Sequence, residues 1–488
     1  MKNLFIFGIG GTGSRVVKAL TMMLASGMEL RDVENVVPII IDPDIANGDL
    51  TRTVDILNLY REIRRKGLSE KSSFFKTNIC ALSDLGNTDK DNSTGEFIFE
   101  IEGVKDNRFR DFISFQELDK SNKAFSSILF SDENLNTQME VGFKGNPNIG
   151  SVVLNKFSKT ALFQNFASCF NKDDRIFIIS SIFGGTGAAG FPLILKNIRS
   201  ADAQVPRSQF LREAQIGAIT VLPYFSVDKN DRTSIDSNSF VSKAKAALNY
   251  YSRNVSGNNS LQALYYIGDS AINGQLGSDG AAEQKNRAHF VELAAALSIQ
   301  DFCSYEDDEL SIKDGKVHKP KFLEFGLHEE AGKIKFTDLG KRTRNLIAKP
   351  LTQYLLFKNY FQYHFDEYHE DAWAKNGHNK LQTIYLDKTW HKRIAEFNYH
   401  FEDWLTEMSN SNVSFNPFIY RNHGDDILNI VVNSPEKKKF LSVNGIEYFR
   451  KILNKSEPDF DILPDSNQKL LALFSSVTEQ IINSKISL

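Results

Sequence analysis

Two glycine-rich stretches decide the fold: Gly8-Ile9-Gly10-Gly11-Thr12-Gly13-Ser14 and, later in the chain, Gly184-Gly185-Thr186-Gly187-Ala188-Ala189-Gly190. The first follows the apolar run Leu4 to Phe7, and the second follows Ile176 to Ile179. After each stretch, apolar residues recur at helical spacing. The sequence therefore predicts two strand–turn–helix units of the same construction.

Glycine suits such turns because the backbone must approach an anion closely and adopt dihedral angles that a side chain would block. The helix that follows offers unpaired N–H groups and the positive end of its dipole to a phosphate. Two such turns on one sheet indicate a nucleoside triphosphate. Taken alone, the first turn also fits the dinucleotide-binding fingerprint, with Asp42 as the ribose-binding acid after the run Val36 to Ile41. A tight corner without any ligand is the third interpretation.

The second stretch carries a resemblance to a known family. The segment Ile182-Phe183-Gly184-Gly185-Thr186-Gly187, followed by Pro192, resembles the signature loop of the tubulin/FtsZ superfamily. The first stretch is similar to the first phosphate loop of that family, and Gln215 to Phe225 resembles the strand after its signature helix. The resemblance covers residues 1 to 310 and is greatest to divergent prokaryotic tubulin-like proteins. Phe183, Ala188 and Ala189 depart from the family pattern, so GTP is implied by the resemblance and not by any one residue.

The resemblance implies that GTP or GDP, with Mg²⁺, binds at both turns. The loop after the second strand would lie near the metal and the phosphates, which makes Asp42 and Asp44 candidates for both roles; alternatively, Asp44 caps the following turn. Gly145 and Asn146 resemble a third phosphate loop by position, although a plain surface loop explains them equally well. The expected nucleotide-binding residues of the two turns are Gly8, Gly10, Gly11, Thr12, Gly13, Ser14, Gly184, Gly185, Thr186, Gly187 and Ala188.

The stretch Ala281 to Phe302 is apolar or small on almost every face, which predicts a buried helix. The resemblance implies a central core helix, placed at residues 284–303, whose first turn reads the base. Phe290 would stack on a purine and Asn286 would bind its edge, with His289 beside them. A core phenylalanine and a capping asparagine are the alternatives.

In this superfamily an acidic residue after the central helix of one subunit completes the site of its neighbour. Here Asp307 and Asp308 are the catalytic candidates, to orient or deprotonate the attacking water. The stretch lacks the FtsZ pattern, and a solvated acidic loop is the alternative. All nine histidines lie at or after His289, so chemistry in the first half uses no imidazole base, which suits phosphoryl transfer.

Strand patterns at residues 3–7, 36–41, 175–182, 216–222 and 262–267 alternate with helical stretches. They predict an α/β fold with a doubly wound, mostly parallel sheet. The resemblance implies that this sheet is of tubulin/FtsZ type. The expected domains are a nucleotide-binding domain at 1–283 with an insertion or lid at 69–150, the central helix at 284–303, and a mainly helical domain at 304–488. A hairpin-like stretch is expected at 321–338.

Composition narrows the class of protein. Of the 488 residues, 41% are hydrophobic and 24% charged, which is typical of a globular protein. No apolar run reaches the length of a membrane span, and we expect a cytoplasmic protein. The net charge of −3 gives no strong signal for nucleic acid. The three cysteines are far apart and suggest neither disulfides nor zinc.

Three functions are compatible with these observations. The first is a tubulin-like GTPase that assembles head to tail with other copies of itself. The second is a nucleotide-dependent switch or scaffold that does not polymerise and whose C-terminal region binds a partner protein. The third is a Rossmann-type NAD or adenylating enzyme that uses only the first glycine turn.

Overall fold

The computed structural model describes residues 2–86, 97–101, 103–143, 146–227, 237–256, 259–269, 275–277, 286–313, 316–317, 319–325, 332–411, 413–420, 424, 426–434 and 444–488. Its strands are β1 (Asn3–Ile9), β2 (Asn35–Ile41), β3 (Asn78–Ile79), β4 (Arg175–Ser181), β5 (Gln215–Val221), β6 (Phe225–Val227), β7 (Ala263–Ile267), β8 (Gln275–Gly277), β9 (Ile312–Lys313), β10 (Lys316–Val317), β11 (Lys321–Phe325), β12 (Lys333–Ile334) and β13 (Ser414–Phe415). Its α-helices are α1 (Gly10–Ala25), α2 (Gly48–Gly67), α3 (Leu82–Leu85), α4 (Phe109–Phe112), α5 (Lys120–Leu129), α6 (Asp132–Leu135), α7 (Pro147–Leu154), α8 (Ala161–Cys169), α9 (Gly185–Arg199), α10 (Ser208–Glu213), α11 (Ser237–Tyr251), α12 (Phe290–Ser304), α13 (Lys341–Tyr363), α14 (Ala372–Lys375), α15 (Lys388–Ser409), α16 (Gly445–Ser456) and α17 (Ser466–Lys485).

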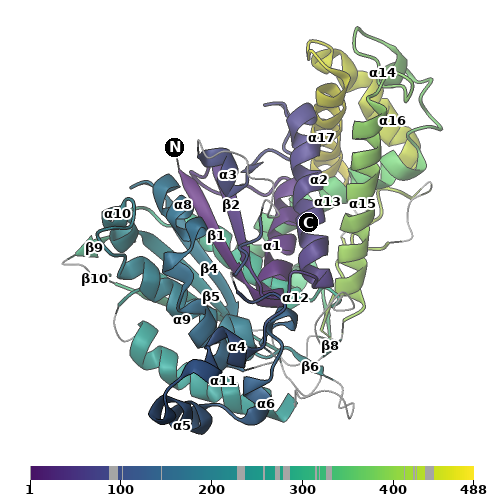
Figure 1. Cartoon of the computed structure of the whole chain (residues 1–488). Coiled ribbons are helices and arrows are strands. Elements are labelled where there is room, and N and C mark those ends of the chain that lie inside the picture. The colour runs from purple at the N-terminus through teal and green to yellow at the C-terminus, as the bar shows by residue number, and fades with distance from the viewer. Residues whose placement is uncertain are drawn as a thin grey trace.

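A seven-stranded sheet in the order β11-β7-β5-β4-β1-β2-β3 forms the centre of the molecule. All neighbouring strands in it are parallel. Helices α8 and α9 lie on one side of the sheet and α1, α2 and α12 on the other (Figure 1). Strands β1, β2 and β4 are buried along their whole length because both faces are covered. The predicted doubly wound parallel sheet is confirmed, with all five expected strands in it.

The expected hairpin at 321–338 is wrong. Strand β11 pairs in parallel with β7, from Lys321 beside Ala263 to Phe325 beside Ile267, and forms an edge of the main sheet. Strand β12 pairs instead with β13, about eighty residues later in the chain. The alternating pattern of residues 321–325 identifies a strand, but it carries no information about which strand is its partner.

The central helix starts later than expected. Residues 286–289 have no regular secondary structure, and α12 begins at Phe290. His289 caps the helix: its Nδ1 accepts the N–H of Val291 at 3.1 Å, while the Glu292 carboxylate accepts the N–H of His289 at 3.3 Å. This reciprocal capping fixes the helix start, and the apolar pattern alone could not locate it.

The C-terminal region is largely helical, as expected, and it packs on α2 and on the rest of the first half (Figure 1). The Trp390 indole of α15 donates to the carbonyl of Ile63 on α2 at 3.0 Å, and the hydroxyls of Ser73 and Ser475 lie 2.7 Å apart. Buried apolar residues from both halves form one continuous cluster. Among the described helices, none is both long and apolar enough to cross a membrane.

The expected insertion at 69–150 contributes short helices, α3 to α7. Its segment 97–99 lies against β2: Ile40 donates its N–H to the Phe97 carbonyl at 2.8 Å, and Phe99 donates to the Ile40 carbonyl at 2.7 Å. The insertion therefore runs along the carboxyl end of β2, next to Asp42. Whether it acts as a lid stays a prediction.

Candidate functional site

The first glycine turn joins β1 to α1 without an intervening loop. Gly10, the first residue of α1, has a φ of +70°, a conformation that favours glycine. A Cβ on Gly13 would lie 2.4 Å from the carbonyl carbon of Gly8, so only glycine lets the helix start so close to the strand end. The N-cap residue, Ile9, makes no side-chain hydrogen bond to this helix start. The first N–H groups of α1 are therefore suited to bind an anion.

The second turn has the same construction. Strand β4 ends at Ser181, and α9 starts at Gly185 without a side-chain cap. A Cβ on Gly187 would lie 2.7 Å from the carbonyl oxygen of Ser181, so glycine is required there for close packing of helix on strand. Of the remaining candidates on α9, Ala188 uses its carbonyl to accept the Tyr251 hydroxyl at 3.1 Å.

The two turns lie against each other. A Cβ on Gly10 would lie 3.6 Å from the Cβ of Thr186 and 3.8 Å from the N atom of Gly187. Strands β1 and β4 are neighbours, with Gly8 beside Ile179, so both helices start at the same edge of the sheet. Two helix N-termini converge there, and their dipoles and N–H groups favour a ligand with several negative charges.

A third helix start lies next to the second turn. Asn146 precedes α7, and Gly150 of α7 packs so closely on α9 that a Cβ on it would lie 3.0 Å from the Ala189 Cβ and 3.1 Å from the Gly185 carbonyl oxygen. The expected third loop is therefore beside the glycine turns. Gly145 lies outside the described residues.

Asp42 and Asp44 follow β2 at the same edge, and both are buried. Asp44 donates its N–H to the Asp42 carboxylate at 3.1 Å. Burial raises the pKa of Asp42 to about 7, with the nearby Asp44 carboxylate adding to the effect. Asn47 caps α2, because its side-chain oxygen accepts the N–H of Asp49 at 2.8 Å.

The donor set at this edge fits a magnesium ion only in part. Across the described residues, no group of three or more acidic, histidine or cysteine side chains could hold a metal by itself. Mg²⁺ characteristically binds one or two protein carboxylates together with substrate phosphates and water. Asp42 and Asp44 therefore fit a Mg²⁺ ion that arrives with a polyphosphate, and they do not form a free-standing metal site.

The described residues at the start of α12 are packed against other parts of the chain. Phe290 is fully buried, and its ring stacks on Phe415 with centroids 5.3 Å apart. The Asn286 amide and backbone N–H both donate to the Asp49 carboxylate, at 2.9 and 3.0 Å. Burial lowers the pKa of His289 to about 4, so this capping imidazole is neutral. In this structure Phe290 packs in the core, and its stacking on a purine stays a prediction.

A buried arginine, which the sequence patterns did not single out, lies beneath the glycine turns. Arg15 of α1 contacts the Asp49 carboxylate at 2.8 Å, the Glu292 carboxylate at 2.5 Å and the Tyr224 hydroxyl at 2.6 Å. It also donates to the Thr12 hydroxyl at 3.4 Å. Burial opposes the charged form, yet these neighbours raise the pKa of Arg15 overall. Arg15 therefore stays charged and ties the first turn to α2 and α12.

A second group of charges continues this network toward the C-terminal region. Arg52 of α2 contacts the Glu407 carboxylate of α15 at 2.7 Å and donates to the Asn286 carbonyl at 2.8 Å. Glu407 also accepts the N–H of Ala288 at 2.7 Å and lies 3.8 Å from Lys18. The signal in the sequence was the pair Arg15 and Lys18, two cations on one side of an otherwise apolar helix, but their partners come from distant segments.

Asp307 and Asp308 lie at the opposite edge of the sheet. Asp307 pairs with Arg175, the first residue of β4, at 2.8 Å and with Lys2, just before β1, at 3.2 Å. The hydrogen bond from Arg175 lowers the pKa of Asp307. The Asp308 carboxylate accepts the N–H of Glu309 at 2.9 Å. Within one chain, these acids and the glycine turns are at opposite strand ends.

No protein-family model and no curated protein matches the sequence. Solved structures do: CetZ from Methanosaeta thermophila strain DSM 6194 is 14% identical, with 62% of this chain and 51% of that chain covered and a TM-score of 0.28. CetZ2 from Haloferax volcanii, a GTPγS-bound protofilament, is 14% identical, with 63% and 60% covered and a TM-score of 0.30. The TubZ-Bt two-stranded filament is 11% identical, with 83% and 79% covered and a TM-score of 0.26.

CetZ and TubZ are tubulin/FtsZ-family proteins, the family that the glycine turns resemble. The match spans between 51% and 62% of the length of the three CetZ structures. At such low identity, these likenesses assign no role to any residue of this chain.

Proposed function

We propose that this chain is a tubulin-like protein that binds GTP or GDP between its two glycine turns and hydrolyses GTP. The observation that carries the proposal is the close approach of Gly10 to the Thr186–Gly187 segment, which brings together two helix starts whose N-cap residues make no side-chain cap. One such turn is a common corner, but two in contact provide N–H groups for a chain of phosphates. The guanine base is taken from the family resemblance of the second turn.

In the proposed site, backbone N–H groups of α1 and α9 hold the phosphates, and the Thr12 and Thr186 hydroxyls lie at the same helix starts. Asp42 and Asp44 would bind Mg²⁺, which would neutralise phosphate charge. Asn146 and the start of α7 lie near enough to the second turn to respond to the terminal phosphate. The cytoplasm, which supplies GTP, is the compartment that this function implies.

The proposal includes hydrolysis completed between two copies. Asp307 and Asp308 lie at the amino ends of the strands, and the glycine turns lie at their carboxyl ends. Head-to-tail stacking therefore brings the acids of one copy to the nucleotide of the next. Asp308 is the better candidate to orient or deprotonate water, since Asp307 is held by Arg175 and Lys2.

One observation favours the second candidate function, a nucleotide-dependent switch that does not polymerise. The ion pairs of Asp307 with Lys2 and Arg175 engage one of the two acids within its own chain. A switch predicts bound nucleotide with slow turnover that is independent of protein concentration. Its C-terminal region would then be the surface for a partner protein. The third candidate, a dinucleotide or adenylating enzyme, leaves the second turn without a role.

The first test is identification of the nucleotide released from the purified, denatured protein by ion-exchange chromatography and mass spectrometry. We expect GDP or GTP. A nicotinamide dinucleotide would overturn the proposal, and an adenine nucleotide would overturn the choice of base.

The second test changes Thr186 to valine, which keeps the branched shape and removes the hydroxyl. Loss of a hydrogen bond to a charged phosphate should weaken binding of a fluorescent GTP analogue by about 10- to 100-fold. Thr389→Val, on the exposed surface of α15, is the matched control and should bind as the wild type does. Equal affinity of both variants would show that the second turn does not contact the nucleotide.

A further inference from the structure

The proposed function gives no role to Tyr224, a residue of the loop between β5 and β6. This loop follows the carboxyl end of β5, and β5 is the neighbour of β4 in the sheet. Tyr224 is buried, with 2% of its surface exposed. A buried tyrosine hydroxyl is normally paired, and its partners indicate what the side chain does.

The hydroxyl of Tyr224 connects it to the first glycine turn. Arg15 donates from Nη2 to this oxygen at 2.6 Å, and the same nitrogen donates to the Thr12 hydroxyl at 3.4 Å. Thr12 is the third residue of α1 and belongs to the glycine turn. Through one guanidinium, the Tyr224 hydroxyl therefore holds the helix start at the end of β1.

The ring of Tyr224 connects it to the second glycine turn. Its centroid lies 6.2 Å from that of Phe183, with the two ring planes at 78°, which is an edge-to-face arrangement. Phe183 is buried and directly precedes Gly184, the N-cap residue of α9. Phe183 is also one of the residues that depart from the tubulin/FtsZ pattern, and this contact gives it a role.

The start of α12 supports Tyr224 from a third side. The Tyr224 hydroxyl donates to the Glu292 carboxylate at 2.8 Å, and its ring lies against the His289 imidazole with centroids 5.2 Å apart. Burial raises the pKa of Tyr224, so the hydroxyl keeps the proton that it donates. Tyr224 therefore joins both glycine turns to one helix.

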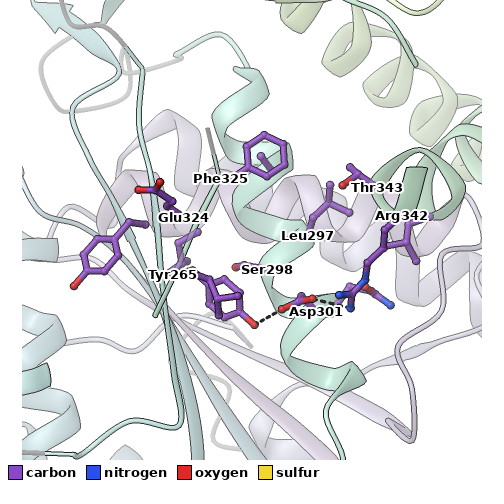
Figure 2. Close-up of a pocket in the computed structure, with 14 residues that line it drawn as sticks. Tyr265, Leu297, Ser298, Asp301, Glu324, Phe325, Arg342 and Thr343 are labelled. Carbon is purple, nitrogen blue, oxygen red and sulfur yellow. Dashed lines mark hydrogen bonds and ion pairs between the residues drawn. The ribbon is translucent and has the colours of Figure 1, made fainter. Parts of the chain in front are cut away.

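Helix α12 is also held at its other end. Asp301, in its last turn, accepts the Tyr265 hydroxyl of β7 at 2.7 Å and pairs with Arg342 of α13 at 2.7 Å. Figure 2 shows these contacts beside a cavity of about 190 Å³. Because α12 is fixed at both ends, it is a firm support for the tyrosine that contacts its start.

We propose that Tyr224 is a positioning residue that sets the spacing of the two glycine turns and thereby their fit to a polyphosphate. The inference rests on the proposed nucleotide site and adds to it a residue outside both turns. The hydroxyl holds the Thr12 side through Arg15, and the ring holds the Phe183 side. A ligand that contacts two helix starts at once depends on the distance between them, so its affinity falls when that distance is no longer fixed.

The test compares GTP with GMP on the full-length protein, by displacement of a fluorescent GTP analogue. Tyr224→Phe removes the hydroxyl and keeps the ring. In this variant GTP should bind about five- to tenfold more weakly than in the wild type. GMP has a single phosphate and makes fewer contacts with the two helix starts, so its affinity should fall less than about twofold. A general loss of structure would weaken both ligands equally.

Tyr354→Phe is the matched control, because it removes another buried hydroxyl, which donates to Asn398 at 3.0 Å in the C-terminal helical region. It should change neither affinity. Phe183→Leu removes the ring contact at the second turn and should also weaken GTP more than GMP. In the Tyr224→Phe, Phe183→Leu double variant, the loss of GTP affinity should be smaller than the product of the two single losses, because both changes break the same connection.

Hydrogen exchange without nucleotide separates this inference from the proposed function. Amides of residues 10–13 and 184–187 should exchange faster in Tyr224→Phe than in the wild type or in Tyr354→Phe. If the wild type binds no guanine nucleotide, the proposed function fails and the exchange rates decide the role of Tyr224. Equal losses for GTP and GMP, or unchanged exchange at both turns, would overturn that role. If Tyr224→Phe does not fold, the same comparisons on Phe183→Leu decide.

Discussion

Arg15 is the residue on which the first glycine turn depends most. Its guanidinium is buried with two carboxylates, Asp49 and Glu292, and with the Tyr224 hydroxyl. A buried ion pair adds little net stability over a well-packed apolar pair, but removal of one member leaves the other charges without compensation. Without Arg15, Glu292 would have no ion pair with any residue that the structure describes, and Asp49 would keep only Arg52, at 3.6 Å.

The first prediction follows from this arrangement. Arg15→Leu should lower the free energy of unfolding by about 3 to 5 kcal/mol, because it leaves buried carboxylates unpaired. The measurement is chemical denaturation followed by circular dichroism. Arg31→Leu, which removes an exposed ion pair with Glu306, is the control and should cost at most about 1 kcal/mol. Similar losses for the two variants would contradict the importance of the buried network.

The second prediction concerns pH. The pKa of Asp42 is about 7 in the folded protein and ordinarily near 3.8. As the pH rises from 4 to 8, the unfolded chain loses this proton before the folded protein does, so stability falls. Asp42→Asn removes that loss. Relative to the wild type, the variant should therefore gain about 2 to 4 kcal/mol of stability between pH 4 and pH 8.

Denaturation without Mg²⁺ or nucleotide, repeated across this pH range, tests the second prediction. Asp32→Asn changes an exposed carboxylate, so its free energy of unfolding should differ from that of the wild type by the same amount at every pH. Plots of the free energy of unfolding against pH that run parallel for Asp42→Asn and the wild type would contradict the prediction. In that case Asp42 ionises normally in the folded protein, and its burial has no consequence for stability.

At the scale of elements, the contact of α9 with β4 sets the position of the second turn. Gly187→Ala places a Cβ within 3 Å of the Ser181 backbone, so the helix must shift away from the strand. We expect a loss of about 1 to 3 kcal/mol in stability and weaker nucleotide binding. Gly340→Ala, where a Cβ would meet no atom within 4 Å, is the matched control in thermal denaturation. Equal midpoints for the two variants would contradict the close packing.

Local patterns in the sequence predicted the elements that periodicity specifies. Strands β1, β2, β4, β5 and β7 and the two glycine turns were all expected, because apolar runs and glycine spacing act over a few residues. The partner of β11 and the start of α12 were not, because the first depends on a strand far away and the second on a histidine cap. The Arg15 network was missed for the same reason: its members come from α1, α2, α12 and the loop at Tyr224.

At the scale of the whole molecule, the acidic loop and the glycine turns lie at opposite edges of one sheet. Copies that carry Asp308→Asn keep the turns, and copies that carry Thr186→Val keep the acidic loop. Each alone should hydrolyse GTP at least about tenfold more slowly than the wild type. An equal mixture should recover about a quarter of wild-type turnover, because one interface in four then combines an intact turn with an intact loop.

Phosphate release measured over a dilution series tests this prediction. Glu306→Gln, in the same loop, is the control and should retain wild-type turnover. No recovery in the mixture, together with turnover per copy that is constant on dilution, would reject assembly and favour the switch.

The bridge from Arg52 to Glu407 makes the last hundred residues inseparable from the first seventy. A fragment that stops before α15 would expose the Ile63 carbonyl and the apolar side of α2. It would also remove Glu407, the acid that Lys18 and Arg52 share, and leave Arg52 with Asp49 at 3.6 Å. Such a truncation should yield insoluble protein instead of a folded N-terminal domain. Gene fusions and tags should therefore be placed at the ends of the chain, because a truncation between the two halves would remove the Arg52–Glu407 ion pair.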